Sequence, residues 1–221
     1  MIFKKVRDKK RQPRRPVPIP NSEHKIINGN KNLIICFGGM ALRFGGILPF
    51  EFLNYLSSTY TDYCDLIFYI DIEQCWYHKG IKNITNSIDE TILYLNNTIT
   101  DRKYEKVIFM GTSAGGYASI LFGSICNVNN VISFIPQTII KKPINLNYSN
   151  LNNIINKNTK YLLYGDTSVQ DINGDHHISH CENIGCFTNV KIIKNSGCKL
   201  KQLRDSGFIK ILIDDILNNK L

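Results

Sequence analysis

The chain has 221 residues, of which 43% are hydrophobic and 20% are charged, as in a globular domain and unlike a disordered chain, a coiled coil or a collagen-like rod. Its formal net charge is +9, but residues 1–20 contribute +7 of it through eight Lys and Arg residues and one Asp. The rest of the chain is nearly neutral, which excludes a domain whose whole surface is basic and coats nucleic acid.

Residues 1–20 are predicted to be an extended arm, because four prolines between positions 13 and 20 block helix formation. We expect this basic arm to be disordered and to precede a single domain over residues 21–221. It could dock on an anionic partner, either nucleic acid or a membrane surface, or only solvate the terminus. The sequence has no apolar stretch typical of a signal peptide and no window of the ~18 apolar residues that a membrane span needs. With seven cysteines, an odd number, these features favour an intracellular and most simply cytoplasmic protein.

Six short apolar runs without polar alternation predict strands that are buried on both faces of a mostly parallel sheet. These runs are residues 33–37, 66–70, 107–110, 131–135, 161–164 and 190–193. Helical patterns between them cover residues 84–99, where Ser87 and Glu90 are spaced as a capping box, 114–125 and 206–218. Alternating strands and helices indicate an α/β fold in one domain, with functional groups at the carboxyl ends of the strands. The Asn-rich segment 136–160 is the one candidate for a cap.

A G-x-S-x-G motif, Gly111-Thr112-Ser113-Ala114-Gly115, stands directly after the strand 107–110 and directly before a helix. Such a strand-to-helix turn is so tight that its flanking positions must be small. Ser113 would project from the sheet edge, where the amide of Ala114 could stabilise an oxyanion. A plain glycine turn is the alternative interpretation.

Two loops at neighbouring strand ends complete the predicted site. Cys36-Phe37-Gly38-Gly39-Met40 leaves the first core strand with two glycines, so an amide of Gly39 or Met40 could be the second oxyanion donor. The loop after residues 66–70 holds Trp76, Tyr77 and His78, which could line a substrate pocket or pack over the rim of the sheet.

The order of glycine loop, aromatic loop, G-x-S-x-G elbow and a later acid resembles a minimal α/β-hydrolase over residues 33–217. The resemblance implies that Ser113 is the nucleophile and that an acid follows the strand 161–164. Asp166 and Asp171 are the two candidates, and we prefer Asp171. The resemblance also calls for a histidine after the last strand, and no histidine occurs after His180.

The missing late histidine leaves three interpretations, because a serine needs an adjacent base to become a nucleophile. The base could come from the group His176, His177 and His180, of which we choose His177 as the representative. His78 could reach in from the aromatic loop instead. Alternatively, the site is degenerate, with Cys198 near the place of the lost base.

These features predict a serine hydrolase that acts on a small-molecule ester or related acyl bond. The alternative is a catalytically degenerate α/β-hydrolase fold that serves as a binding or scaffolding module. The histidines at 176, 177 and 180 with Cys181 and Cys186 match no standard zinc spacing, so we expect neither a metal nor an organic cofactor.

Overall fold

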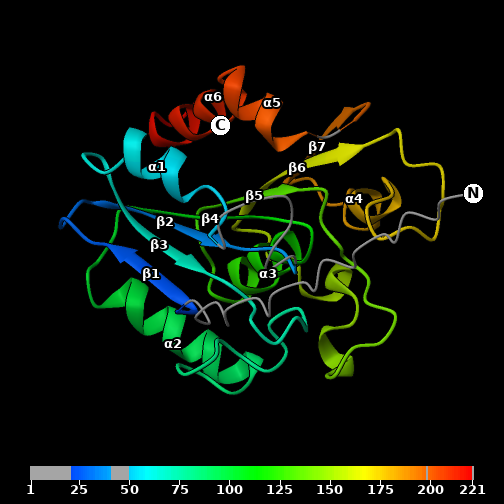
Figure 1. The fold of residues 1–221 in the computed structure, drawn as a ribbon, viewed down its shortest axis with the longest axis horizontal. Helices are drawn as coiled ribbons and strands as arrows, with labels where there is room; N and C mark the ends of the chain where they lie inside the picture. Colours follow the sequence, from blue (N-terminus) through cyan, green and yellow to red (C-terminus); the bar gives the residue numbers. More distant parts are fainter. Residues whose placement is uncertain (1–20, 41–49, 198, 221) are drawn as a thin grey trace, which may run out of the picture.

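The computed structural model describes residues 21–40, 50–197 and 199–220, so the predicted arm over residues 1–20 lies outside the described residues. A seven-stranded sheet runs through the molecule in the order β1-β3-β2-β4-β5-β6-β7, with β1 antiparallel to β3 and the other neighbours parallel (Figure 1). The strands are β1 (Glu23–Ile26), β2 (Asn32–Phe37), β3 (Cys64–Tyr69), β4 (Lys106–Thr112), β5 (Asn130–Phe134), β6 (Lys160–Asp166) and β7 (Val190–Asn195). The predicted mostly parallel α/β sheet is therefore confirmed, and β1 is an edge strand that the apolar runs did not indicate.

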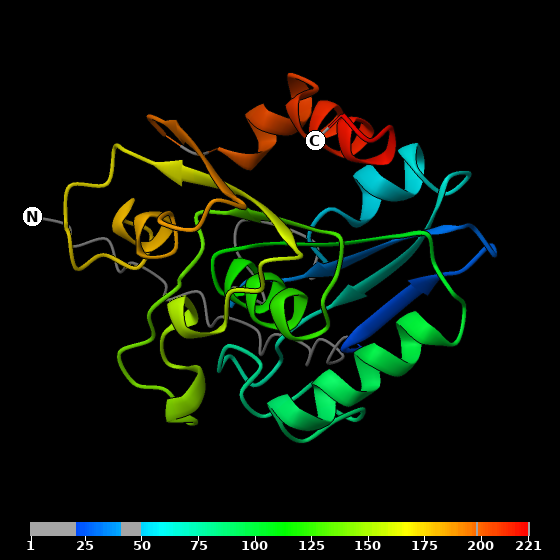
Figure 2. The same cartoon turned by 180° about the vertical axis from the view of Figure 1, so that it is seen from behind.

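Helices cover both faces of the sheet (Figures 1 and 2). One face carries α1 (Leu53–Thr59), α5 (Leu200–Asp205) and α6 (Phe208–Leu217). The other carries α2 (Ile88–Thr100), α3 (Ala114–Ile125), α4 (Ser179–Asn183) and the 3-10 turns η1 (Leu146–Tyr148) and η2 (Leu151–Ile154). Alternate residues of β2 point to opposite faces, so Leu33 and Ile35 join one core and Ile34 and Cys36 join the other. Burial on both faces is the reason that these strands lack polar alternation.

The predicted helices are present with shifted bounds. In α2, the Ser87 side chain caps the Glu90 amide at 3.1 Å, as the capping-box spacing predicts. The Glu90 carboxylate, however, accepts from the amide of Asn86 instead of that of Ser87. The helix expected over 206–218 corresponds to α6, whereas α5 was not predicted. Gly207 separates the two helices, and its φ of 78° is the left-handed conformation that glycine tolerates.

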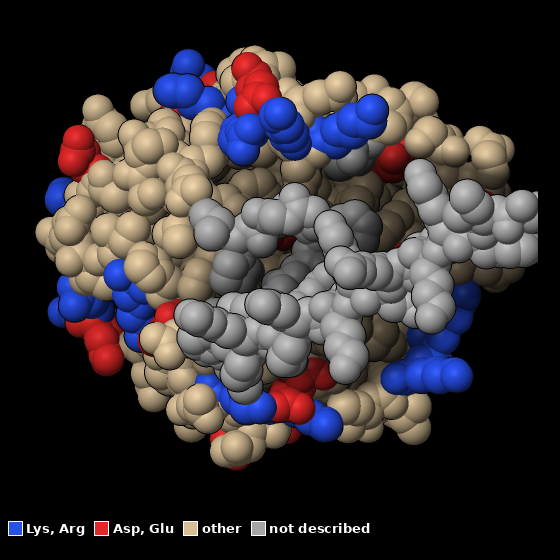
Figure 3. All heavy atoms as spheres, viewed as in Figure 1, with Lys and Arg blue, Asp and Glu red and all other residues tan. Residues whose placement is uncertain are grey.

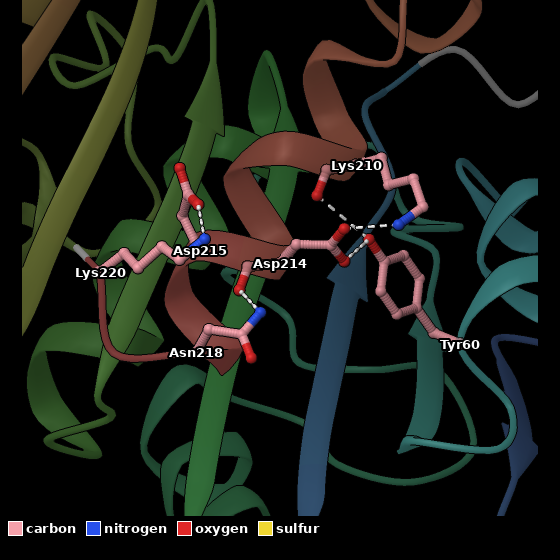
Figure 4. Close-up of polar contacts among 6 residues, drawn as sticks. All are labelled: Tyr60, Lys210, Asp214, Asp215, Asn218 and Lys220. Atoms are coloured by element: carbon pink, nitrogen blue, oxygen red, sulfur yellow. Dashed lines mark hydrogen bonds and ion pairs between the residues drawn. The ribbon is translucent and has the colours of Figure 1, made fainter.

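A polar contact links α6 to the end of α1. The Tyr60 hydroxyl donates to Asp214 at 2.9 Å, and Lys210 pairs with the same carboxylate (Figure 4). Burial, with this hydrogen bond as a further cause, raises the pKa of Tyr60 well above its ordinary value. The neutral phenol is therefore a permanent donor to α6.

The strand order places a topological switch point between β2 and β4. The chain passes from β2 to β3 on one side and returns to β4 on the other side of β2. In open parallel sheets, the crevice at the carboxyl ends of two such strands is the usual place for a ligand. Residues 38–40 follow β2 and Ser113 follows β4, so the two predicted oxyanion loops meet there.

Charged side chains are dispersed on the one face that Figure 3 shows. On the face in Figure 3, Lys and Arg side chains form separate groups near the rim, with Asp and Glu side chains among them. None of the described helices has the length and apolar character that a membrane crossing requires.

Candidate active site

Ser113 is the turning point between β4 and α3. Its backbone has φ 56° and ψ −117°, a region that non-glycine residues rarely occupy and that functional sites retain when the surrounding structure enforces it. The Ser113 amide donates to Phe134 in β5 at 3.0 Å, which holds the turn against the neighbouring strand. Its hydroxyl makes no helix-capping bond, and the side chain is only partly buried. The hydroxyl is thus presented at the sheet edge.

The glycines of the motif allow this turn to sit directly on β2. A Cβ atom added to Gly115 would lie 2.0 Å from the carbonyl oxygen of Phe37, and one added to Gly111 would lie 2.3 Å from the carbonyl oxygen of Gly115. Both distances are far inside van der Waals contact with backbone atoms. The G-x-S-x-G spacing is therefore a packing requirement here.

A histidine from the loop after β6 meets Ser113. The Oγ atom of Ser113 lies 2.8 Å from Nε2 of His176, which is the distance expected between a nucleophile and its general base. Both side chains are partly accessible. The histidine group thus supplies the base candidate, but through His176 and not through His177.

The other two histidines of that group have structural contacts. Nδ1 of His177 lies 2.9 Å from the Ser179 hydroxyl, within its own turn. Nδ1 of His180 accepts from the Thr138 amide at 3.1 Å, and burial lowers the pKa of His180. His180 therefore secures segment 136–160 on α4 instead of facing Ser113.

Neither predicted acid is hydrogen-bonded to the side chain of His176. Asp171 is exposed, and its carboxylate accepts from the Asn173 amide at 2.9 Å. Asp166 ends β6, and its carboxylate accepts from the amides of Ser168 and Gly197, each at 2.8 Å. Within residues 21–40, 50–197 and 199–220, no hydrogen bond joins a carboxylate to His176. The observed arrangement is a serine–histidine pair, and Cys198, the predicted marker of a lost base, lies outside the described residues.

The glycine loop after β2 lies beside the elbow. A Cβ atom on Gly39 would lie 3.9 Å from the Cβ atom of Ser113, so the loop backbone borders the nucleophile. The amide of Gly38 is already bound to the Tyr69 carbonyl at 2.8 Å. This leaves Gly39 and Met40 as the candidate donors from the loop, beside Ala114 at the first position of α3.

Glu51 is a site residue that sequence reasoning missed. It lies just before α1 and near Gly39 and Thr112, and neither its Oε2 atom nor the Thr112 hydroxyl has a hydrogen-bond partner among the described residues. Burial raises its pKa to about 7. Nothing in the local sequence around Glu51 signals this position, because only the return of the chain to α1 places it at the end of β2.

In the aromatic loop, Trp76 is partly exposed, whereas Tyr77 and His78 are buried. Nε1 of Trp76 donates to the side-chain oxygen of Gln137 at 2.6 Å. The backbone amide of Gln137 donates to the backbone carbonyl of Ser113 at 3.4 Å. Trp76 and Gln137, the latter not anticipated, therefore border the elbow. Tyr77 is fully buried, and its hydroxyl donates to the carbonyl of Gly38 at 3.1 Å.

His78 is a structural residue and not a second base candidate. Its Nδ1 accepts from the Asn145 amide at 3.1 Å, so Nε2 carries the proton that is shared with the Tyr117 hydroxyl at 3.0 Å. Both ring nitrogens of His78 are therefore engaged in hydrogen bonds. Tyr77 and His78 are buried and hold the aromatic loop in place, as in the alternative interpretation that they pack over the rim of the sheet.

No metal centre is found among the described residues, which contain no group of three His, Cys, Asp or Glu side chains that could hold an ion.

No known family model matches the sequence, and no curated protein does. Solved structures do match. An α/β-hydrolase enzyme from the metagenome of lagoon sediments at Mar Chica, Morocco, superposes with a TM-score of 0.56 at 14% identity, covering 87% of this chain and 93% of the other. Alpha/beta hydrolase domain-containing protein 10 from mouse gives 0.53 at 12%, covering 86% and 90%. The capsule O-acetyltransferase of Neisseria meningitidis serogroup A gives 0.57 at 15%, covering 83% and 87%. The chain therefore has the α/β-hydrolase fold.

Proposed function

We propose that this protein is a serine hydrolase that cleaves an ester or a related acyl bond of a small molecule through a covalent acyl-enzyme on Ser113. The observation that carries the proposal is the 2.8 Å contact between Ser113 Oγ and His176 Nε2 at a strained elbow. A hydroxyl that approaches an imidazole at the switch point of a parallel sheet has the base that nucleophilic catalysis requires.

In the proposed reaction, His176 Nε2 takes the hydroxyl proton as Ser113 Oγ bonds to the substrate carbonyl carbon. The carbonyl oxygen becomes an oxyanion, which the amide of Ala114 and an amide of the Gly39–Met40 loop stabilise. As the carbon–oxygen bond to the leaving group breaks, the leaving alkoxide receives the proton from His176. Water then loses a proton to His176 and attacks the acyl carbon, which releases the acid and restores Ser113.

The second candidate function is a binding module that keeps the fold without turnover. The observation that favours it is that no hydrogen bond joins a carboxylate to the His176 side chain within the described residues. A carboxylate holds the catalytic imidazole in its tautomer and stabilises the imidazolium, and a site without one loses several orders of magnitude in rate.

Hydrolysis of p-nitrophenyl esters of short acyl chains separates the two functions. Release of p-nitrophenol above the uncatalysed rate by the wild-type chain, and its loss in Ser113→Ala, is the result expected of the hydrolase. Equal rates for the two proteins over pH 6 to 9 would favour the binding module.

A further inference from the structure

Tyr77 is a fully buried residue whose hydroxyl takes no part in the proposed reaction. Its ring lies edge-on against Phe37 and Phe122, with ring centroids 5.6 Å and 6.3 Å away. The hydroxyl reaches two backbone carbonyls, that of Gly38 at 3.1 Å and that of Tyr69 at 3.2 Å. Burial raises the pKa of this phenol well above its ordinary value, so the hydroxyl keeps its proton near neutral pH.

The backbone of Tyr77 is held in a strained conformation. Its φ is 60° and that of Trp76 is 55°, in the left-handed region that bulky residues rarely occupy. The buried carboxyl group of Asp71 accepts from the amide of Cys75 at 2.6 Å and from that of Tyr77 at 3.0 Å. These two hydrogen bonds fix the loop around one side chain and enforce the turn. Strain that the surrounding structure enforces in this way is concentrated at functional sites.

The glycine loop is fixed at both ends by contacts from this side. The Gly38 amide donates to the Tyr69 carbonyl at 2.8 Å, so that carbonyl already has a donor besides Tyr77. The Gly38 carbonyl accepts from the Tyr77 hydroxyl, and no other hydrogen bond within the described part of the chain uses it. At the other end of the loop, the side chain of Gln74 donates to the Met40 carbonyl at 2.5 Å.

The carbonyl of Gly38 belongs to the same peptide group as the amide of Gly39. This peptide is trans, and the C=O and N–H bonds of a planar trans peptide point in opposite directions. A carbonyl directed at Tyr77 therefore directs the Gly39 amide to the opposite side. Among residues 21–40, 50–197 and 199–220, no hydrogen bond uses that amide. Because a Cβ atom on Gly39 would lie 3.9 Å from the Cβ atom of Ser113, this oriented donor borders the nucleophile.

We propose that Tyr77 is a positioning residue for the oxyanion site: its buried hydroxyl holds the Gly38 carbonyl and so orients the Gly39 amide toward the carbonyl oxygen of the substrate. This inference rests on the proposed function for its effect on rate. The orientation of the peptide by the hydroxyl does not depend on turnover, and no covalent bond changes.

The direct test measures ¹⁵N relaxation of Gly39 in the full wild-type chain and in Tyr77→Phe, which removes only the hydroxyl. We expect a rigid amide in wild type, with an order parameter near about 0.85, and a fall toward about 0.6 in Tyr77→Phe. The matched control is Tyr161→Phe, in which Gly39 should stay rigid. Tyr161 is also buried, and its hydroxyl contacts Ser124 at 2.7 Å in the last turn of α3, the end remote from the elbow.

Two outcomes of this measurement would overturn the proposal, whether or not the protein is active. One is a mobile Gly39 amide in the wild-type chain, a result that needs no variant to fold. The other is equal rigidity of Gly39 in wild type and Tyr77→Phe.

The kinetic test measures hydrolysis of a p-nitrophenyl ester by the same three proteins. Tyr77→Phe should lower kcat by about tenfold to a hundredfold and keep KM within about threefold, because the amide acts on the oxyanion of the transition state more than on the bound ester. Tyr161→Phe should stay within about threefold of wild type in both constants. A fluorophosphonate should label each protein to one adduct per chain at its end point, which excludes a loss of folded protein as the cause.

The two tests separate this inference from the proposed function. A wild-type kcat in Tyr77→Phe, or an equal loss in Tyr161→Phe, would refute the role of the Tyr77 hydroxyl and leave the hydrolase proposal intact. A Gly39 amide that loses its order in Tyr77→Phe, in a protein that neither hydrolyses the ester nor is labelled, would refute the hydrolase and keep the orientation of the peptide by Tyr77.

Discussion

Ser113 Oγ and His176 Nε2 lie 2.8 Å apart, although 63 positions separate the two residues in the chain. His176 comes from the loop after β6, the place where the family resemblance puts the acid, and not from the end of β7. The histidine that contacts Ser113 therefore lies earlier in the chain than the resemblance implies. Among the described residues, no carboxylate is hydrogen-bonded to this histidine, so the basicity of His176 is the main question about this site.

The identity of the base can be tested by single substitutions in the histidine loop. His176→Ala should lower the rate of ester hydrolysis by about 10² or more, because the proton of Ser113 then has no acceptor. His177→Ala is the matched neighbour and should stay within about threefold of wild type, since its Nδ1 contacts Ser179. A large loss in His177→Ala with a small one in His176→Ala would show that the loop is rearranged during the reaction.

The acid preferred from the sequence is expected to contribute little. Replacement of a triad aspartate by asparagine lowers kcat by about 10⁴ in a protease with a full triad. Asp171→Asn should change kcat/KM by less than about threefold, because its exposed carboxylate accepts a hydrogen bond from Asn173 in its own loop. A loss near 10³ would mean that Asp171 reaches His176 in the working enzyme.

The packing of the elbow predicts an unequal response of two glycines. Gly115→Ala should lower the free energy of unfolding by about 3 kcal/mol, because the new methyl group meets the fixed carbonyl of Phe37. Gly29→Ala should cost about 1 kcal/mol, since Gly29 has open space around it and only its positive φ of 80° opposes a side chain. Urea unfolding of both variants measures the difference, and equal costs would contradict the close contact between elbow and β2.

The buried His78 predicts a loss of stability in mild acid. Burial lowers the pKa of His78 from its ordinary 6.5, so the unfolded chain takes up a proton at a higher pH than the folded one. The stabilisation is complete above pH 6.5 and is lost as the pH falls through the folded-state pKa, by up to about 1.4 kcal/mol per pH unit. Thermal unfolding between pH 7 and 5 should show a smaller decline in His78→Gln than in wild type. The exposed His24→Gln serves as the control and should decline like wild type; an unchanged slope in His78→Gln would contradict this account.

Much of the fold could be predicted because its signals are local. The core strands can be recognised in the sequence as apolar runs. The elbow requires small residues at fixed positions on both sides of Ser113. Strand β1 gave no such signal, because its sequence Glu-His-Lys-Ile is polar and it forms through pairing with β3. The edge position, with half of its residues exposed, explains why the strand does without a hydrophobic pattern.

The site was harder to predict because its members come from distant loops. Consecutive histidines point in different directions, so the choice between His176 and His177 depends on the turn geometry that binds His177 to Ser179. No local sequence signal indicates that Glu51 and Gln137 lie near the elbow, because only the tertiary fold places them there. The anionic partner of the basic arm stays a prediction, since residues 1–20 lie outside the described structure. The cytoplasmic location stays a prediction as well.

The central claim is that Ser113 is an activated nucleophile, and intact-protein mass spectrometry after treatment with a fluorophosphonate tests it most directly. The account predicts one adduct per chain, located at Ser113, absent in Ser113→Ala and strongly slowed in His176→Ala. No adduct on the wild-type chain at any pH from about 6 to 9, or equal modification of Ser113→Ala, would contradict it.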